Sequence, residues 1–330
     1  MNSPVLVNML VQAAVMIILC IGFTLTYMME KFPNFGHTSI ATVGTIIAFS
    51  LVRIWGYNPY STWLVSTTAC GLLAMGLYLL VVRPIKTNGP HIITLSFVFF
   101  AIAIVVGSMV SIFSYWFMYS QGNLAQGFYL TPFDFSWQGY PGVLVVGLPL
   151  CAVIVIALYL FFTRVRLGIA VRAVAENEPL AAILGVNTYI IHIFSWFITG
   201  ALAGLAGAII PLWRYTGLGY SDTFLVLVMA GSVLGGIQSV AGAVIGGFLL
   251  SMVEKGLTLW MMEVYGVWTA DWGGLISPLF IVTVMMIEPE GIMGILDNPN
   301  HPIRTLRRRL NLFRIVRKSE RSSPRSRVFV

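Results

Sequence analysis

The chain has 330 residues, of which 58% are apolar and only 9% are charged. Because a soluble domain carries about a quarter charged residues, this composition excludes an ordinary water-soluble fold. The apolar residues lie in long blocks. Residues 143–163, for example, contain no charge and match the roughly 20 residues that a helix needs to cross a bilayer core. The net charge of +7 is mostly local, since residues 304–327 hold ten of the nineteen Lys and Arg residues.

Nine apolar segments follow one another along the chain as candidate membrane helices. They cover residues 5–29, 38–55, 60–82, 91–113, 142–163, 189–210, 222–236, 240–258 and 272–288. The segment 222–236 is too short for a straight crossing, which predicts a half-helix or a re-entrant piece that is buried in protein or lines a cavity. The predicted fold is an all-α polytopic membrane protein with about eight to nine transmembrane helices, including short or re-entrant glycine-rich segments.

Basic residues predict the orientation of these segments. Arg and Lys occur between the third and fourth segments (83–86), between the fifth and sixth (164–172) and in the tail, and all three regions fall on one side. That side is expected to be the cytoplasm. The connection 115–141 has no Lys or Arg and many aromatic rings, as expected at the outer interface. We therefore expect a multi-pass protein of the cell membrane (an inner or plasma membrane), with its N-terminus outside and its C-terminus in the cytoplasm.

The basic tail is expected to be separate from the membrane domain. We assign residues 1–294 to the membrane domain and residues 295–330 to a basic cytoplasmic tail. A basic tail that directly follows the last membrane helix marks the cytoplasmic side and contacts anionic lipid head groups. This interpretation does not require a nucleic-acid partner.

Glycine recurs at three- and four-residue spacing in the later segments. One set comprises Gly200, Gly204 and Gly207, and a second set runs from Gly231 to Gly247. Small residues at this spacing let helix backbones approach closely. We interpret both sets as packing surfaces, and the same smooth surfaces are compatible with a moving gate. The gate candidates are Gly235, Gly236, Gly242 and Gly246.

The chain has no recognisable catalytic or metal-binding motif. No Gly-x-x-x-x-Gly-Lys-Ser/Thr loop occurs, so the chain has no ATPase of its own by that route. The three cysteines lie inside apolar segments without metal or disulfide spacing, and the four histidines are scattered. We predict no catalytic residue, no metal site and no bound cofactor. A membrane enzyme or scaffold is disfavoured because we find no polar intramembrane cluster.

Ionisable residues inside a membrane segment are candidates for function, because burying a charge in lipid is costly. Most such residues here lie near the predicted segment ends, as expected for side chains that reach the interface. Glu254 and Lys255 are the exceptions, since they are adjacent and lie in a small and apolar stretch. A proton- or sodium-coupled carrier normally needs acids in mid-segment, and their absence argues against a secondary transporter.

The segment 164–194 is long for a connection between two membrane helices. Its Ala-rich stretches favour helix, and they are interrupted at Pro179 and Gly185, which predicts two short helical pieces on the membrane face. Charged ends and an apolar middle suit docking into a groove on a partner, although an ordinary surface loop has the same composition. The residues of interest are Arg172, Glu176, Asn177, Glu178, Pro179, Ala182 and Gly185.

This segment resembles the cytoplasmic coupling loop of the permeases of branched-chain amino acid ABC transporters, the LivH/LivM family. In that family the loop contacts the ATPase subunit, which implies a coupling loop over 164–188. Residues 25–49 resemble the family's early segment, in which an Asn-Phe-x-His-Gly run precedes a glycine-containing helix. Asn34 and His37 match that run, and Thr38 replaces the usual glycine. The resemblance makes these three residues pore or gate candidates.

Two later regions resemble the same family in the same order. Residues 231–247 are similar to its glycine-rich hairpin, with Gln238 and Ala241 where Gly and Pro are usual. Residues 287–294 resemble its terminal signature, with Glu288 in place of a basic residue. The early and terminal regions favour the LivH branch.

The resemblance implies one permease subunit of an ABC importer. Its partners would be a second homologous permease, two cytoplasmic ATPase subunits that bind the ATP, and an extracytoplasmic substrate-binding protein. Branched-chain or related small amino acids would cross by alternating access. The alternatives are urea or a short amide as the solute, or a self-contained channel or secondary carrier without an ATPase.

Overall fold

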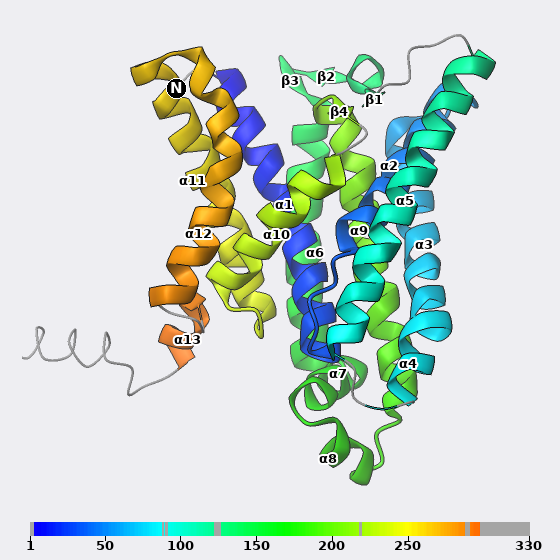
Figure 1. The fold of residues 1–330 in the computed structure, drawn as a ribbon. Helices are drawn as coiled ribbons and strands as arrows, with labels where there is room; N and C mark the ends of the chain where they lie inside the picture. Colours follow the sequence, from blue (N-terminus) through cyan, green and yellow to red (C-terminus); the bar gives the residue numbers. More distant parts are fainter. Residues whose placement is uncertain are drawn as a thin grey trace, which may run out of the picture.

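The computed structural model describes residues 3–87, 89, 92–121, 127–217, 220–287 and 291–297. The chain is almost entirely helical (Figure 1). The helices are α1 (Ser3–Glu30), α2 (His37–Arg53), α3 (Pro59–Leu77), α4 (Arg83–Thr87), α5 (Ile92–Gln121), α6 (Gly142–Arg164), α7 (Arg166–Glu176), α8 (Glu178–Ile183), α9 (Thr188–Trp213), α10 (Tyr220–Gly235), α11 (Val240–Tyr265), α12 (Gly273–Ile287) and α13 (Gly291–Asp297). A π-helical turn, Tyr78–Val82, joins α3 to α4.

The prediction of a polytopic helical membrane protein is confirmed. Within the described part of the chain, seven helical segments are long and apolar enough to span a membrane. They are Val5–Glu30, Pro59–Thr87, Ile92–Ser120, Gly142–Arg164, Thr188–Trp213, Val240–Tyr265 and Gly273–Gly294. The shorter helices α2 and α10, of 17 and 16 residues, occupy the two remaining predicted segments. The main differences lie at the ends, where α5 and α11 continue about two turns beyond the predicted residues 113 and 258.

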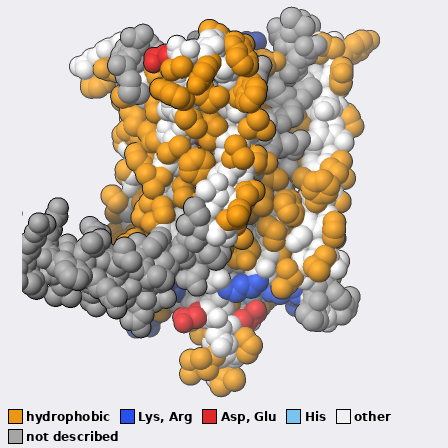
Figure 2. All heavy atoms as spheres, turned by 60° about the vertical axis from the view of Figure 1, so that its left-hand side comes forward, with side chains coloured by type: hydrophobic (Ala, Val, Ile, Leu, Met, Phe, Trp, Pro, Cys, Tyr) orange, Lys and Arg blue, Asp and Glu red, His pale blue; other side chains and the backbone are white. Residues whose placement is uncertain are grey.

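Helices α1 and α9 form the centre of the bundle. In each, 72% of the most apolar stretch is buried, against 11% in α5 and 17% in α6, which lie at the periphery. Figure 2 shows hydrophobic side chains over most of the flank, as a lipid-facing surface requires. Because lipid is as apolar as these side chains, the central helices need close van der Waals packing to associate.

Small residues supply that packing around α9. A Cβ atom added at Gly204 would lie 2.5 Å from the Ser66 carbonyl oxygen of α3, and one added at Gly44 of α2 would lie 2.5 Å from the Gly204 carbonyl oxygen. Gly207 lies equally tightly against the backbone of Ala41. The helix backbones therefore touch at these positions, as the glycine spacing predicted.

The two ends of the bundle differ in chemistry. At one end, β1 (Gly127–Phe128) pairs with β4 (Thr216–Gly217), and β2 (Ser136–Trp137) pairs with β3 (Tyr140–Pro141), both antiparallel. Helices α4, α7 and α8 lie at the opposite end (Figure 1). The basic residues of 83–86 and 164–172 thus share one end, as predicted. The basic tail lies outside the described residues, apart from 295–297 at the end of α13.

Candidate functional site

The predicted coupling segment folds as two short helices, α7 and α8, that project from one end of the bundle. The Asn177 side chain begins α8 by accepting a hydrogen bond from the Leu180 N–H at 3.0 Å. Pro179 lies in the first turn of α8, where its missing N–H has no cost, so the helix break falls at Asn177 and not at Pro179. Gly185 ends α8 with a φ of +86°, a left-handed conformation that glycine adopts readily.

The inner face of this segment is packed onto the bundle. Its buried apolar residues form one cluster with the last turns of α1 and the first turn of α9: Leu25, Met29, Phe162, Val171, Val174, Ala175, Ala181 and Ile191. The Lys31 ammonium group also donates a hydrogen bond to the Ala175 carbonyl oxygen at 2.8 Å. The segment is therefore held firmly against the membrane helices.

The outer face of the segment is exposed and partly apolar. Of the seven predicted coupling residues, only Glu178 is partly buried; Arg172, Glu176, Asn177, Pro179, Ala182 and Gly185 are exposed. Sequence reasoning missed Leu180, Ile183 and Leu184, which are 52%, 82% and 75% exposed. Figure 2 shows a knob of hydrophobic side chains at the lower end of the molecule, beyond a band of Lys, Arg, Asp and Glu. The sequence does signal Leu180, Ile183 and Leu184, because these apolar residues lie on or directly after a helix that is too short to bury them.

A network of four charged side chains, two of them buried, links α8 to the bundle. The two imidazole N–H groups of His192 donate to Glu30 Oε1 at 2.8 Å and to Glu178 Oε1 at 2.9 Å. The Lys86 ammonium group donates to Glu30 Oε2 at 2.8 Å and lies 3.8 Å from Glu178 Oε2. The Trp196 indole N–H also donates to Glu30, at 2.9 Å. The network joins α8 to α1, α4 and α9.

The charges in this network balance. Each nitrogen of His192 faces a carboxylate oxygen, so both must carry a proton and the ring is cationic. Two carboxylates thus face two cations, although the Glu30 and His192 side chains are 0% and 2% exposed. The hydrogen bond from His192 lowers the pKa of Glu178 and keeps this carboxyl group ionised.

Sequence reasoning missed Glu30, Lys86 and His192 as members of one site. Folding brings residues 30, 86, 178 and 192 together, and His192 is the one histidine among them. The available signal was an acid at the end of one apolar segment and a histidine at the start of another. Ionisable residues at such positions are functional candidates.

Asn34, His37 and Thr38 lie together in the closed interior of the bundle, each no more than 1% exposed. Asn34 Oδ1 accepts a hydrogen bond from the Gly36 N–H at 3.1 Å, which turns the chain into α2. The Nε2 atom of His37 lies 3.1 Å from the Leu19 carbonyl oxygen. These residues therefore position the start of α2 against the middle of α1.

The four predicted glycines join α10 to α11. Added Cβ atoms at Gly235 and Gly242 would collide with each other's carbonyl groups, and one at Gly246 would collide with the Gly231 carbonyl oxygen and lie 2.5 Å from the Gly235 nitrogen. Gly236 makes the turn between the helices with a φ of +111°. The structure thus places these glycines at a helix–helix contact, separate from the coupling segment.

Comparison with known proteins identifies the family of this chain. The family model described as "Branched-chain amino acid transport system / permease component" matches residues 5–286. The probable branched-chain amino acid transport permease protein LivH of Methanocaldococcus jannaschii is 29% identical over 294 residues, covering 89% of this chain and 93% of that protein. The high-affinity branched-chain amino acid permease protein BraD of Pseudomonas aeruginosa is 25% identical over 304 residues, covering 88% and 94%.

Among solved structures, PsaBC from Streptococcus pneumoniae in complex with Fab covers 89% of this chain, and 95% of its own chain is matched. The TM-score is 0.48 and the sequence identity is 16%. The family match extends over most of the chain and includes every membrane-spanning segment up to α12. The chain therefore belongs to the branched-chain amino acid transport permease family, as a permease subunit of an ABC importer and not an enzyme in itself.

Proposed function

We propose that this subunit moves a branched-chain or related small apolar amino acid across the cell membrane by alternating access. Two ATPase subunits would supply the energy by binding α7 and α8 from the cytoplasm. A second homologous permease would complete the pathway, and an extracytoplasmic binding protein would deliver the solute. The relatives named for branched-chain amino acid transport support the choice of solute.

The exposed apolar knob on α8 carries the proposal. Leu180, Ile183 and Leu184 are exposed at the end of the bundle that carries α7 and α8, so they face water unless a partner covers them. Fully burying one such side chain stabilises a complex by about 1.5–3 kcal/mol. A short helix with three apolar side chains fits a groove on a partner protein.

The charged network at the start of α8 would transmit a movement of this helix to the membrane helices. Glu178 begins α8, and its hydrogen bond to His192 links the helix to α9, while Glu30 and Lys86 extend the link to α1 and α4. A displacement of α8 by the ATPases would therefore move the ends of three membrane helices together. The pore and gate candidates in α2, α10 and α11 would respond through their contacts with α1 and α9.

Substitution of the knob tests the proposal. Ile183→Asp combined with Leu184→Asp should reduce co-purification of the ATPase subunits at least about tenfold, since each tenfold change needs only about 1.4 kcal/mol. Val267→Asp is the matched control, because Val267 is also exposed, at 74%, but follows α11 at the opposite end of the bundle. Full co-purification and full ATP hydrolysis by the double variant would contradict coupling through α8. A channel or carrier that works without ATPases would then be the better interpretation.

A further inference from the structure

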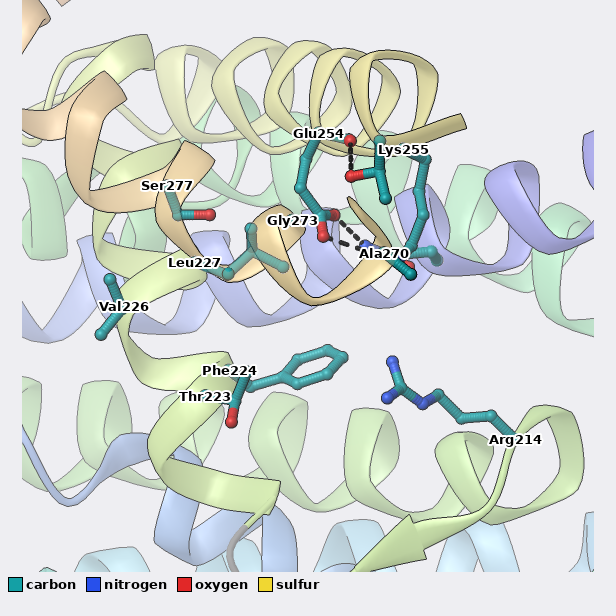
Figure 3. A pocket seen from close by; sticks show the side chains of 13 residues that line it. Arg214, Thr223, Phe224, Val226, Leu227, Glu254, Lys255, Ala270, Gly273 and Ser277 are labelled. Carbon is teal, nitrogen blue, oxygen red and sulfur yellow. Dashed lines mark hydrogen bonds and ion pairs between the residues drawn. The ribbon is translucent and has the colours of Figure 1, made fainter. Parts of the chain in front are cut away.

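A polar cavity of about 390 Å³ lies between α1, α10, α11 and α12, with Arg214 of the α9–β4 junction at its edge (Figure 3). It lies toward the end of the bundle that carries the strands, away from α7 and α8. Its volume falls within the range of about 300–1,000 Å³ that small-molecule sites occupy. Glu254 and Lys255, the two ionisable residues that stand out within a membrane segment, both line it.

One side of the cavity is built to accept hydrogen bonds. The Gln12 amide N–H group donates to Glu254 Oε2 at 2.6 Å, and Gln12 is only 1% exposed. Because the amide nitrogen faces this carboxylate, the Gln12 carbonyl oxygen needs a different donor, and among the described residues it has none. A buried acceptor without a donor costs free energy. A ligand that carries several N–H donors would hydrogen-bond to the Glu254 carboxylate, which lines the cavity.

Two cationic side chains also line the cavity. The Arg214 guanidinium group lies 5.6 Å from the centre of the Phe224 ring and 5.5 Å from that of Trp213. Figure 3 shows it directed toward the space between Phe224 and the Glu254–Lys255 pair. The Lys255 ammonium group is 3.5 Å from Glu254 Oε1, and its side chain is 31% exposed. Both cations therefore have donors for an incoming carboxylate.

An apolar wall completes the cavity. Phe224 and Leu227 of α10 line it and are 3% and 6% exposed. Charged donors, charged acceptors and an apolar surface thus meet within one space. A neutral amide or a sugar would leave these opposite charges unused, whereas the backbone of an α-amino acid carries one group of each sign.

We propose that this cavity binds an α-amino acid as a zwitterion, with an apolar side chain. Arg214 and Lys255 bind its carboxylate, Glu254 binds its ammonium group, and Phe224 and Leu227 contact its side chain. This inference rests on the proposed function for the class of solute, and it assigns the atoms that recognise the solute. It requires nothing of α7 or α8.

The test uses the full complex in lipid nanodiscs, without ATP and without the binding protein. Saturation-transfer difference NMR measures binding of L-leucine, of 4-methylpentanoate, which lacks the ammonium group, and of 3-methylbutylamine, which lacks the carboxylate. Glu254→Gln should weaken L-leucine and 3-methylbutylamine at least about tenfold and spare 4-methylpentanoate. Arg214→Gln should weaken L-leucine and 4-methylpentanoate and spare 3-methylbutylamine.

Glu263→Gln is the matched control, because Glu263 lies on the same helix, is exposed and does not line the cavity. It should leave the binding of all three probes unchanged. The proposal is wrong if the wild-type complex does not bind L-leucine, or if both cavity variants bind it normally. It is also wrong if the two variants weaken both analogues equally, since a loss of structure would do that.

The result separates this site from the coupling proposal. The knob variant Ile183→Asp with Leu184→Asp should bind L-leucine normally while it loses the ATPases, because α8 lies at the other end of the bundle. The cavity variants should keep the ATPases and lose transport of L-leucine. If the coupling proposal is wrong, the L-leucine binding data still test the cavity. If the cavity proposal is wrong, the co-purification data still test coupling through α8.

Discussion

Glu30 is the last residue of α1, and its carboxylate accepts hydrogen bonds from Lys86 of α4 and from His192 and Trp196 of α9. A carboxylate with no exposed surface is stable in an apolar bundle only when charges and donors surround it, as they do here. The contact between α1, α4 and α9 at this end of the bundle therefore depends on one side chain. This concentration of contacts makes the site sensitive to single substitutions.

Glu30→Gln should destabilise the protein by about 3–5 kcal/mol, because it leaves His192 and Lys86 with less opposing charge in a buried site. The measurement is the thermal unfolding midpoint of the purified subunit in detergent, with the yield of folded protein as a second readout. Glu176→Gln removes the same charge from an exposed position of α7 and should leave the midpoint unchanged. An unchanged midpoint in Glu30→Gln would show that the network adds little stability.

At the scale of elements, α10 and α11 touch through glycines at Gly231–Gly235 and Gly242–Gly246, and this contact depends on the absence of side chains. Gly246 faces the Gly231 carbonyl oxygen, and Gly235 faces Gly242. Lipid provides no hydrophobic drive for helices to associate, so the close van der Waals contact itself holds the pair together. A single methyl group is therefore enough to separate the two helices.

Gly246→Ala should lower the folded yield and the unfolding midpoint, even though alanine favours helix over glycine by about 1 kcal/mol. Gly256→Ala on the same helix is the control, because an added Cβ there meets no atom within 4 Å. That variant should be as stable as the wild type or slightly more stable. If the two variants behave alike, the α10–α11 contact is looser than the structure indicates.

At the scale of the whole molecule, the two ends of the bundle carry different surfaces. The strands lie at one end, and the basic residues around α4 and α7 lie at the other. The excess of Lys and Arg predicts that the α7–α8 end faces the cytoplasm. The basic tail is expected on the same side.

Single cysteines test this orientation. The native cysteines Cys20, Cys70 and Cys151 are all buried and can be replaced to give a cysteine-free background. A membrane-impermeant maleimide should label Ser136→Cys in intact cells, because Ser136 is an exposed residue of β2. It should label Glu176→Cys and Arg317→Cys only after the cells are permeabilised. Labelling of position 176 in intact cells would reverse the predicted topology.

The sequence by itself determined the membrane class, the nine helical segments and the family. Every helix that crosses lipid needs a minimum length and an apolar composition, and both can be recognised from consecutive residues. The uncharged stretch that forms most of α6 is an example. The Asn177 cap and the left-handed Gly185 are local in the same way, and the two short helices of residues 166–183 were predicted from composition.

Only the tertiary structure decided which distant residues meet. Glu30, Lys86, Glu178 and His192 come from four separate elements, and no spacing in the sequence marks them as one network. The cavity joins Gln12 to Glu254, which are 242 positions apart. Such contacts depend on how the helices rotate and pack, and that is set by many small van der Waals interactions together. The pattern of apolar residues along the sequence predicts the helices, but it does not predict how they are rotated against one another.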